Sequence, residues 1–342
     1  MSSAIVSLLP RGADGSSTLV ALDLASLEPT AVRPIPPNMY LDDGRTAPVE
    51  HCRGLAFHGG DLWVALFNCV RRYSLVDAST LVLEDRGLLT HPQGADIHGL
   101  TADDRTITAV STGAGALVSW QHDSSRKARV VRVDRVDRRP DLRFPRSTAQ
   151  AAGHLDWRQA MPAQLHLNDV YRVSDAYIVC GLDRLITVTA AGCRPLVHRP
   201  GSILHGGLPL PDGSLAVTNA VTGSIELFAL ADGAFVACWD VADPTAWFVR
   251  GLAVWSDLLI TLRSAIIPQA ERRVTQPNRS SRRPSTGSSS FGISIVDRHT
   301  GAILAEQDLV IDGAGAVAYA AVVPEELPTI RDGRRRQELI AA

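Results

Sequence analysis

Four of the ten histidines stand at equivalent places in four repeated phrases of the sequence. They are His51, His98, His166 and His205, and each precedes a glycine or an aspartate by one or three residues. Imidazoles that converge from separate strands can bind zinc, iron or copper, and an open coordination position would make such an ion a Lewis acid. We therefore predict a divalent transition metal held by at least two of the four histidines, because their two different depths prevent all four from reaching one ion.

The same four histidines have two interpretations that need no metal. One imidazole would act as a general acid or base, or all four would only hydrogen-bond to the neighbouring repeat. The remaining histidines fall in predicted turns or loops, where we expect surface positions. They are His58, His91, His122, His154, His198 and His299.

Two arginines occupy the corresponding place in the repeated phrases, Arg53 in "HCRG" and Arg250 in "FVRG". Guanidinium groups that face an enclosed space need anionic partners, since an unpaired buried charge is costly. Asp96 and Asp169 could each supply a structural partner. If that pairing is incomplete, the arginines would bind a carboxylate or phosphate of a small anionic substrate.

The predicted roles divide between catalysis and binding. Catalysis is assigned to His98, His166, Arg53 and Arg250. Substrate binding is assigned to Arg53, Arg250, Asn168 and Asp96. Asp169 stands where the other repeats have glycine, so we expect it to face the sheet and brace the turn.

The phrases open a repeat of about forty residues that consists only of strands and Gly, Asp or Ser turns. The openings fall near residues 51, 96, 166, 203, 248 and 312. Such repeats cannot bury their faces alone, and they close into a β-propeller with one four-stranded sheet per blade. We predict an all-β propeller of six blades, with N-terminal strands completing the last blade. Five or seven blades stay open, because the stretches 120–165 and 263–311 are long enough to hide strands.

The innermost strand of each blade begins near one face of a propeller, so the polar residues that open each repeat should converge at the channel mouth. Side chains alternate along a strand. The side chains expected to point toward the channel are those of His51 and Arg53, Asp96 and His98, His166 and Asn168, Ile203 and His205, and Phe248 and Arg250. The side chains expected to point into the sheet packing are those of Cys52, Ile97, Leu167, Leu204 and Val249.

One propeller domain is predicted over residues 1–325, followed by a tail at 326–342. Residues 268–290 are polar and rich in Arg and Ser, which predicts a mobile insertion. Residues 138–163 would form a loop over one face of the disc or a packed insertion, and either segment could act as a lid.

The composition of the chain indicates which kinds of partner and which cellular compartment to expect. The formal net charge of -2 gives no reason to expect nucleic acid or an acidic membrane as partner. No apolar run approaches about 18 residues, and the N-terminus has no secretory pattern, so we expect a cytoplasmic protein. Five scattered cysteines predict no disulfide framework. The stretch "GAGAVA" lies in no βαβ unit, so no nucleotide cofactor is predicted.

The phrases "ADIHGL", "LHLNDVYRV", "FVRGLAV" and "FGISIVDRHTGAIL" resemble a bacterial β-propeller family of unassigned function. More distantly, the chain is similar to the six-bladed superfamily of senescence marker protein, gluconolactonase and strictosidine synthase. This resemblance covers most of residues 50–325, and it implies a funnel-shaped site on the axis, usually built around a divalent metal.

In gluconolactonase-like propellers the metal is calcium, held by a glutamate, asparagines and an aspartate. Asn168 in "LNDV" matches one of these asparagines. The other ligand places carry His98, His205 and Arg250, which are poor ligands for calcium because it prefers oxygen. The histidine set looks more like that of propellers that bind zinc on three histidines or iron on four.

The sequence therefore predicts an enzyme with a histidine-lined site at the channel mouth. Its chemistry would be a metal-assisted lyase, isomerase, cyclase or hydrolase step on a small anionic substrate. One alternative is a propeller without catalytic activity that binds a ligand or a protein. A second alternative is a calcium-dependent lactonase. The oligomeric state stays open.

Overall fold

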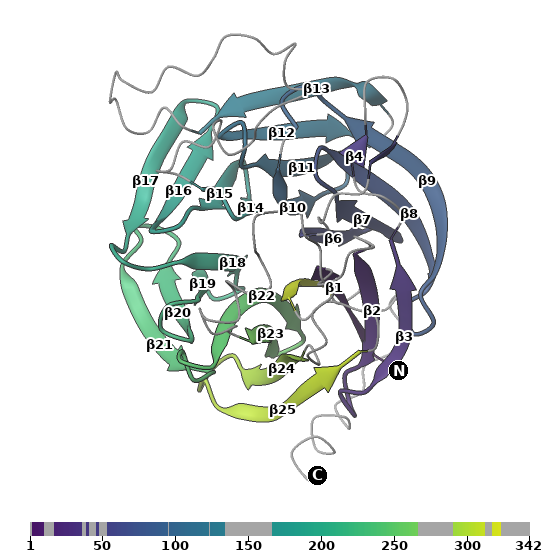
Figure 1. Cartoon of the computed structure of the whole chain (residues 1–342). Coiled ribbons are helices and arrows are strands. Elements are labelled where there is room, and N and C mark those ends of the chain that lie inside the picture. Colours follow the sequence, from purple (N-terminus) through teal and green to yellow (C-terminus); the bar gives the residue numbers. More distant parts are fainter. Residues whose placement is uncertain are drawn as a thin grey trace, which may run out of the picture.

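The structure of the chain, a computed structural model, has six four-stranded sheets arranged around a central axis (Figure 1). It describes residues 2–9, 17–35, 39–40, 46–47, 53–94, 96–122, 124–133, 166–265, 290–311 and 317–322. All the secondary-structure elements assigned within these ranges are strands. The prediction of an all-β propeller with six blades is confirmed.

The strands of each blade follow one another from the axis to the rim, and neighbours run antiparallel. The first blade contains β6 (Leu55–His58), β7 (Asp61–Ala65), β8 (Cys69–Asp77) and β9 (Val82–Thr90). The second contains β10 (Ile97–Ala102), β11 (Thr106–Ser111), β12 (Ala116–Gln121) and β13 (Ser124–Arg132). The third contains β14 (Asp169–Val173), β15 (Ala176–Cys180), β16 (Arg184–Thr189) and β17 (Gly192–His198).

The fourth and fifth blades have the same order. The fourth contains β18 (Leu204–Pro209), β19 (Ser214–Asn219), β20 (Ser224–Ala229) and β21 (Phe235–Asp240). The fifth contains β22 (Trp247–Trp255), β23 (Leu258–Ala265), β24 (Ser290–Asp297) and β25 (Ile303–Val310).

The sixth blade closes the ring with strands from both ends of the chain. From the axis outward, its strands are β26 (Val317–Val322), β1 (Ser3–Leu9), β2 (Thr18–Asp23) and β3 (Pro29–Pro34). Ile5 of β1 lies opposite Val322 of β26. The prediction that N-terminal strands complete the last blade is therefore confirmed.

Six hydrophobic clusters fill the seams between neighbouring blades. Ile5 and Leu62 share the seam between the sixth and first blades, and Trp63 and Trp120 share the next one. Truncating a fully buried leucine or isoleucine to alanine costs about 2 to 5 kcal/mol. The seams therefore hold each innermost strand firmly in place.

The glycines of the repeated phrases bring the innermost strands close together near the axis. A Cβ on Gly54 would collide with the carbonyl oxygen of His98, in the next blade. A Cβ on Gly99 would collide with Oδ1 of Asp169, one blade further on. Glycine is needed at these two places because the neighbouring strand fills the space of a side chain.

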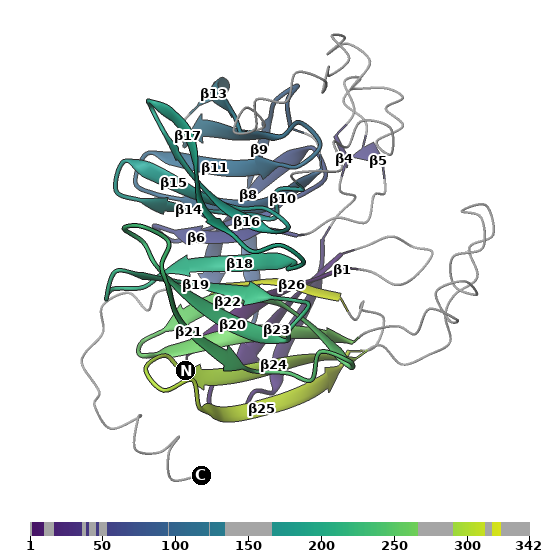
Figure 2. The same cartoon turned by 90° about the vertical axis from the view of Figure 1, so that its left-hand side faces the viewer.

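All six innermost strands begin at the same face of the disc, which we call the mouth face (Figure 2). The small hairpin of β4 (Met39–Tyr40) and β5 (Thr46–Ala47) also lies on this side. The predicted loop at 138–163 and the tail at 326–342 lie outside the described residues, as does the insertion at 268–290 except for Ser290. Within the described ranges, no helix has the length and hydropathy needed to cross a membrane.

Candidate functional site at the mouth of the channel

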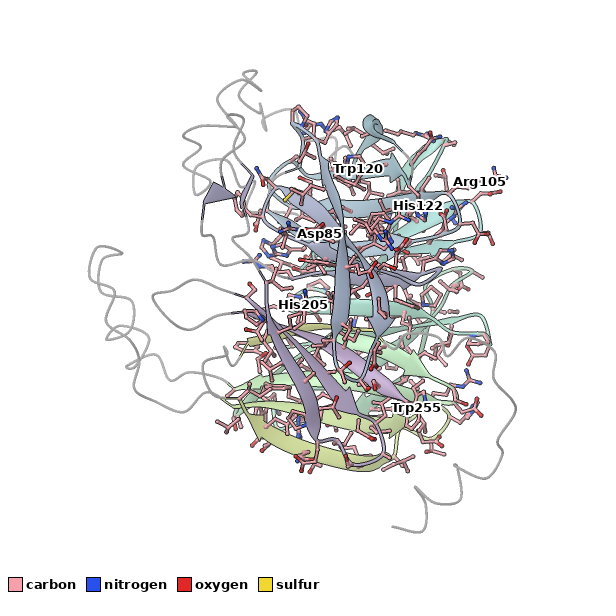
Figure 3. The ribbon with its side chains drawn as sticks, turned by 90° about the vertical axis from the view of Figure 1, so that its right-hand side faces the viewer. Asp85, Arg105, Trp120, His122, His205 and Trp255 are labelled. Carbon is pink, nitrogen blue, oxygen red and sulfur yellow. The ribbon has the colours of Figure 1, made fainter. Side chains whose placement is uncertain are left out.

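The predicted polar residues stand at the beginnings of five consecutive innermost strands. Arg53 precedes β6, Asp96 precedes β10, and His98 is the second residue of β10. His166 and Asn168 precede β14, His205 is the second residue of β18, and Arg250 lies in β22. Between them, Ile97, Leu167, Leu204 and Val249 are fully buried in the seams, as the alternation predicted. Cys52 and His51 lie outside the described residues. In Figure 3 the labelled His205 lies toward the mouth face and His122 toward the opposite face.

Arg53 is held across the seam between the first two blades. Its Nη1 donates a hydrogen bond to Oδ1 of Asp96 at 3.2 Å and a second one to Nε2 of His98. Because a guanidinium can only donate, this hydrogen bond uses the tautomer of His98 that carries its proton on Nδ1, and Oδ1 of Asp96 lies 3.3 Å from the same Nε2. Asp96 has a φ of 51°, a left-handed conformation that aspartate tolerates better than most residues. His98 and Asp96 thus fix the direction of the Arg53 guanidinium.

His166 packs edge to face against His98, with ring centroids 4.9 Å apart. His98 is 1% exposed and His205 is 7% exposed, whereas His166 is only partly buried. Of these three imidazoles, His166 is therefore the one most accessible to a ligand.

All three imidazoles are held in the neutral form at pH 7. Burial, with the charge of Arg53 added, lowers the pKa of His98 to about 3, although Asp96 opposes this. Burial and the charge of Arg250 bring the pKa of His205 well below its ordinary value. Burial also lowers the pKa of His166, against the opposing charge of Asp96. The charges of Arg53 and Arg250 act on both His166 and His205, and we call these four residues and His98 the charged cluster.

Asn168 links the third and fourth blades at the wall of this cluster. Its Nδ2 donates a hydrogen bond to the carbonyl oxygen of Leu204 at 2.7 Å, and the residue is 2% exposed. Its Oδ1 is buried and accepts no hydrogen bond from the described residues. The amide therefore has a structural role toward Leu204 and retains one acceptor atom.

Asp169 is held in the strand packing next to the cluster, as predicted from its place in the repeat. Its carboxylate accepts hydrogen bonds from the Tyr171 hydroxyl and from the backbone N–H of Val170, the latter at 2.9 Å. Burial raises the pKa of Asp169 to about 7, although both hydrogen bonds favour the charged form. Asp169 therefore pairs with Tyr171, and no hydrogen bond joins it to Arg53 or Arg250 among those described.

The described side chains do not fit a divalent cation by themselves. No group of three or more His, Cys, Asp or Glu among them could hold a metal ion. The Nε2 lone pair of His98 faces Arg53, and the charges of Arg53 and Arg250 act on the neighbouring imidazoles. Two guanidinium charges oppose the approach of a divalent cation. The predicted metal set includes His51, outside the described residues, so metal binding stays a prediction.

His58, His91 and His122 were predicted at the surface, and all three are partly buried. His122 lies in a turn after β12, as predicted. Its ring packs at 5.2 Å from the ring of Trp63 in the seam between the first two blades, and its Nε2 is buried. Trp63 follows Leu62 in an alternating strand, but the sequence does not show that the end of β12 reaches it from the next blade. His198 and His299 are exposed, as expected.

Sequence reasoning did not single out the buried Arg263 of β23. Its guanidinium is bound by Glu306 and Asp308 of β25, at 2.7 and 3.0 Å, and lies 5.2 Å from the ring centroid of Trp247. Glu306 and Asp308 are two residues apart in β25, so their side chains lie on the same side of the strand. This spacing was the feature of the sequence that could have indicated a shared arginine partner. These contacts make Arg263 a structural residue of the fifth blade.

The fold is a six-bladed propeller, and its candidate site is the group of arginines and histidines at the starts of the innermost strands. No protein-family model and no curated protein matches the chain. Solved structures with the same fold include a protein of unknown function from Bacteroides caccae, with 10% identity, a TM-score of 0.57, and coverage of 95% of this chain and 100% of that one.

Two further solved structures show the same likeness. A chain of the nidogen/laminin complex has 10% identity and a TM-score of 0.58, covering 94% of this chain and 98% of that one. A candidate 6-phosphogluconolactonase from Bacteroides fragilis has 13% identity and a TM-score of 0.54, covering 95% of this chain and 98% of that one. At these identities the likeness shows the propeller fold alone.

Proposed function

We propose that the chain is an enzyme that binds a small anionic molecule at the mouth face and uses His166 to move a proton. The observation that supports this most directly is the contact between two neutral imidazoles, His98 and His166, beside the Arg53 guanidinium. A neutral, accessible imidazole is the side chain best suited to accept a proton near pH 7.

Arg53, His98 and His166 would have different roles in the reaction. The Nε2 lone pair of His98 accepts the hydrogen bond from Arg53, so His98 positions Arg53 and is not the base. The contact described for His166 is made by its ring against His98, and its nitrogens can face a ligand. His166 is therefore assigned the proton transfer, and His98 the orientation of Arg53.

Arg53 and Arg250 would bind the negative charge of the substrate. The charges of Arg250 and Arg53 both lower the pKa of His205, so positive charge acts at this place from the first and the fifth blade. A guanidinium can also stabilise negative charge that develops on an oxygen when a neighbouring carbon or a water molecule loses its proton. This supports an isomerase, lyase or hydrolase step and needs no metal in the steps assigned to these residues.

The test begins with untagged protein and a set of anionic compounds that includes hydroxy acids, phosphorylated sugars and anionic lactones. Calorimetry measures binding, and product analysis measures turnover. His166→Gln should lower turnover by roughly 100-fold and leave binding close to that of the wild type. Arg250→Gln should weaken binding, and the exposed His299→Gln serves as the matched control without an effect.

Two results would overturn the proposal in different ways. Binding without turnover by the wild-type protein would support the alternative of a propeller that only binds a ligand. Loss of turnover with a chelator, restored by zinc or by calcium, would instead support the metal-dependent predictions, and elemental analysis of the untagged protein would identify the ion.

A further inference from the structure

Two large apolar side chains stand at the beginnings of the innermost strands of the fourth and fifth blades. They are Ile203 and Phe248, and both are partly exposed. They occupy the place in the repeated phrases that Asp96 holds in the second blade and His166 in the third. The side chains at this place are therefore polar in the second and third blades and apolar in the fourth and fifth.

Ile203 and Phe248 are not needed to fill the seams between the blades. The residues that follow them, Leu204 and Val249, are fully buried and belong to the clusters of two seams. Ile203 and Phe248 belong to none of the six clusters that the described residues form. They therefore present apolar surface outside the seams.

The pairing of β22 with β23 fixes the direction of the Phe248 side chain. From Phe248, opposite Ser264, to Arg250, opposite Leu262, the pairing is regular. The side chains of Phe248 and Arg250 therefore lie on the same side of β22. Their contact agrees with this, because Cζ of Arg250 lies 5.8 Å from the centroid of the Phe248 ring. The ring thus lies next to a guanidinium of the charged cluster.

Ile203 continues the regular pairing of β18. Leu204 lies opposite Asn219, and the N–H of Ala220 donates a hydrogen bond to the carbonyl oxygen of Ile203 at 2.9 Å. Because Leu204 points into a seam, the residues before and after it, Ile203 and His205, point to the other side of the strand. His205 lies toward the mouth face (Figure 3). Ile203 therefore lies at the mouth, on the same side as the charged cluster.

The positive charge at the mouth thus has apolar surface next to it. Arg250 contacts Phe248, and Ile203 shares a side of its strand with His205, on which both arginines act. We propose that the ligand is an amphiphilic anion, whose carboxylate or phosphate monoester group binds Arg53 and Arg250 and whose apolar chain or ring packs against Ile203 and Phe248. This inference rests on the proposed function and names the class of substrate for the same site.

The proposal separates apolar anions from hydroxylated anions of similar size. Removing each methylene of an apolar chain from water strengthens binding by up to about fourfold. A hydroxyl group placed against Ile203 or Phe248 would instead lose its hydrogen bonds to water without replacement. Hexanoate and gluconate have the same charge and the same number of carbon atoms, and hexanoate should bind more tightly by roughly tenfold or more.

The test is calorimetric titration of the full, untagged chain with butyrate, hexanoate, octanoate and gluconate. Affinity should rise along the first three compounds by about two- to fourfold per methylene. Hexanamide has the apolar chain without the charge and should bind roughly tenfold more weakly than hexanoate. Hexyl phosphate in place of hexanoate identifies which anionic group the two arginines bind more tightly.

Two kinds of variant separate the apolar contact from the charge. Phe248→Ser and Ile203→Ser should each reduce the rise in affinity from butyrate to octanoate. Arg250→Gln should weaken the binding of both compounds by a similar factor and leave the rise unchanged. Val310→Ser, at a 56% exposed position of β25, is the matched control and should bind all compounds as the wild type does. Thermal unfolding of each variant shows that it is folded.

The possible failures of this inference and of the proposed function differ. Equal affinity for butyrate, hexanoate and octanoate, or tighter binding of gluconate than of hexanoate, would overturn the inference and leave the proposed anion binding intact. A rise in affinity that is the same in Phe248→Ser and Ile203→Ser as in the wild type would place the apolar contact elsewhere and overturn it too. Absence of binding by every anion would contradict the proposed function itself, and the inference with it.

Discussion

Two buried ionisable groups on neighbouring innermost strands have pKa values shifted in opposite directions. His98 of β10 has its pKa lowered to about 3, whereas Asp169 of β14 has its pKa raised to about 7. Burial is the main cause in both places, because it disfavours whichever form is charged. The surroundings differ: His98 contacts Arg53 and Asp96, and Asp169 contacts Tyr171 and Val170.

The surroundings of His98 and those of Asp169 are two zones that meet at a single glycine. Gly99 follows His98 directly, and its missing side chain leaves the space that Asp169 fills. On one side of Gly99 the arginines and imidazoles form the charged cluster at the mouth face. On the other side, the Asp169 carboxyl and the Tyr171 hydroxyl form a buried hydrogen-bonded pair. The mouth carries the charges on which the proposed anion binding rests, whereas the pair of Asp169 and Tyr171 lies within β14 and packs against Gly99 of β10.

The largest effect is expected from a change at the boundary itself. Gly99→Ala places a Cβ against both Oδ1 and the backbone Cα of Asp169, and rotating a side chain cannot relieve the backbone collision. We expect a loss of about 3 kcal/mol in the free energy of unfolding, measured by urea denaturation. Gly94→Ala is the control for alanine at a glycine without a positive φ, where the nearest atoms lie 3.1 Å from the added Cβ, and an equal loss there would contradict the close approach.

His98→Gln should break the charged zone and leave the Asp169 zone intact. The unfolded chain binds a proton on His98 near pH 6.5, whereas the folded protein does so only near pH 3. The unfolded state therefore holds more protons between these values, and the wild-type protein loses stability as the pH falls from about 6.5. The slope from this one group is at most about 1.4 kcal/mol per pH unit.

The measurement is thermal or urea unfolding of wild-type and His98→Gln protein across the range from about pH 3.5 to about pH 7. The variant should show a shallower loss of stability toward acid. Because it also replaces the imidazole acceptor of Arg53 Nη1 by a flexible amide, it should shift Arg53 and weaken anion binding as well. An unchanged acid slope would contradict the neutral, buried state of His98.

Asp169→Asn should have a smaller effect, and one of opposite sign. The folded protein keeps the Asp169 proton up to about pH 7, whereas the unfolded chain loses it near pH 3.8. The folded state therefore holds more protons between these values, and this group lowers the stability of the wild-type protein as the pH rises through that range. The side-chain amide of the variant cannot ionise, so the variant should lose this decline, whose slope is at most about 1.4 kcal/mol per pH unit.

Unfolding curves of both proteins at about pH 5 and about pH 8 would measure the difference. Tyr171→Phe is a useful companion variant because it removes the hydroxyl that favours the carboxylate. It should extend the decline of stability to higher pH, because the folded protein then keeps the Asp169 proton further above pH 7. The same decline in wild-type and Asp169→Asn protein would assign it to another group.

The sequence predicted the blades and the sides of their innermost strands well, because both follow from short-range patterns. The alternation that put Ile97 and Leu204 in the seams has a period of two residues and needs no knowledge of the neighbouring blade. The hydrogen bond from Arg53 to His98 could not be predicted, because it depends on the distance between two blades. The same limitation explains the error at His122, whose contact with Trp63 also crosses a seam.

The smallest expected effect is a change in the titration of His166. Burial is the main cause that lowers its pKa, and the charges of Arg53 and Arg250 lower it further, against Asp96. Arg250→Gln removes one of these charges without a contact to the imidazole among those described, so it should raise the pKa of His166 toward its ordinary value. NMR titration of the His166 ring protons measures this directly. Arg199→Gln, at the rim between the third and fourth blades, should leave the pKa unchanged. If both variants behaved like the wild type, Arg250 would not act on the mouth of the channel, and an anion bound there would have to be held by Arg53 alone.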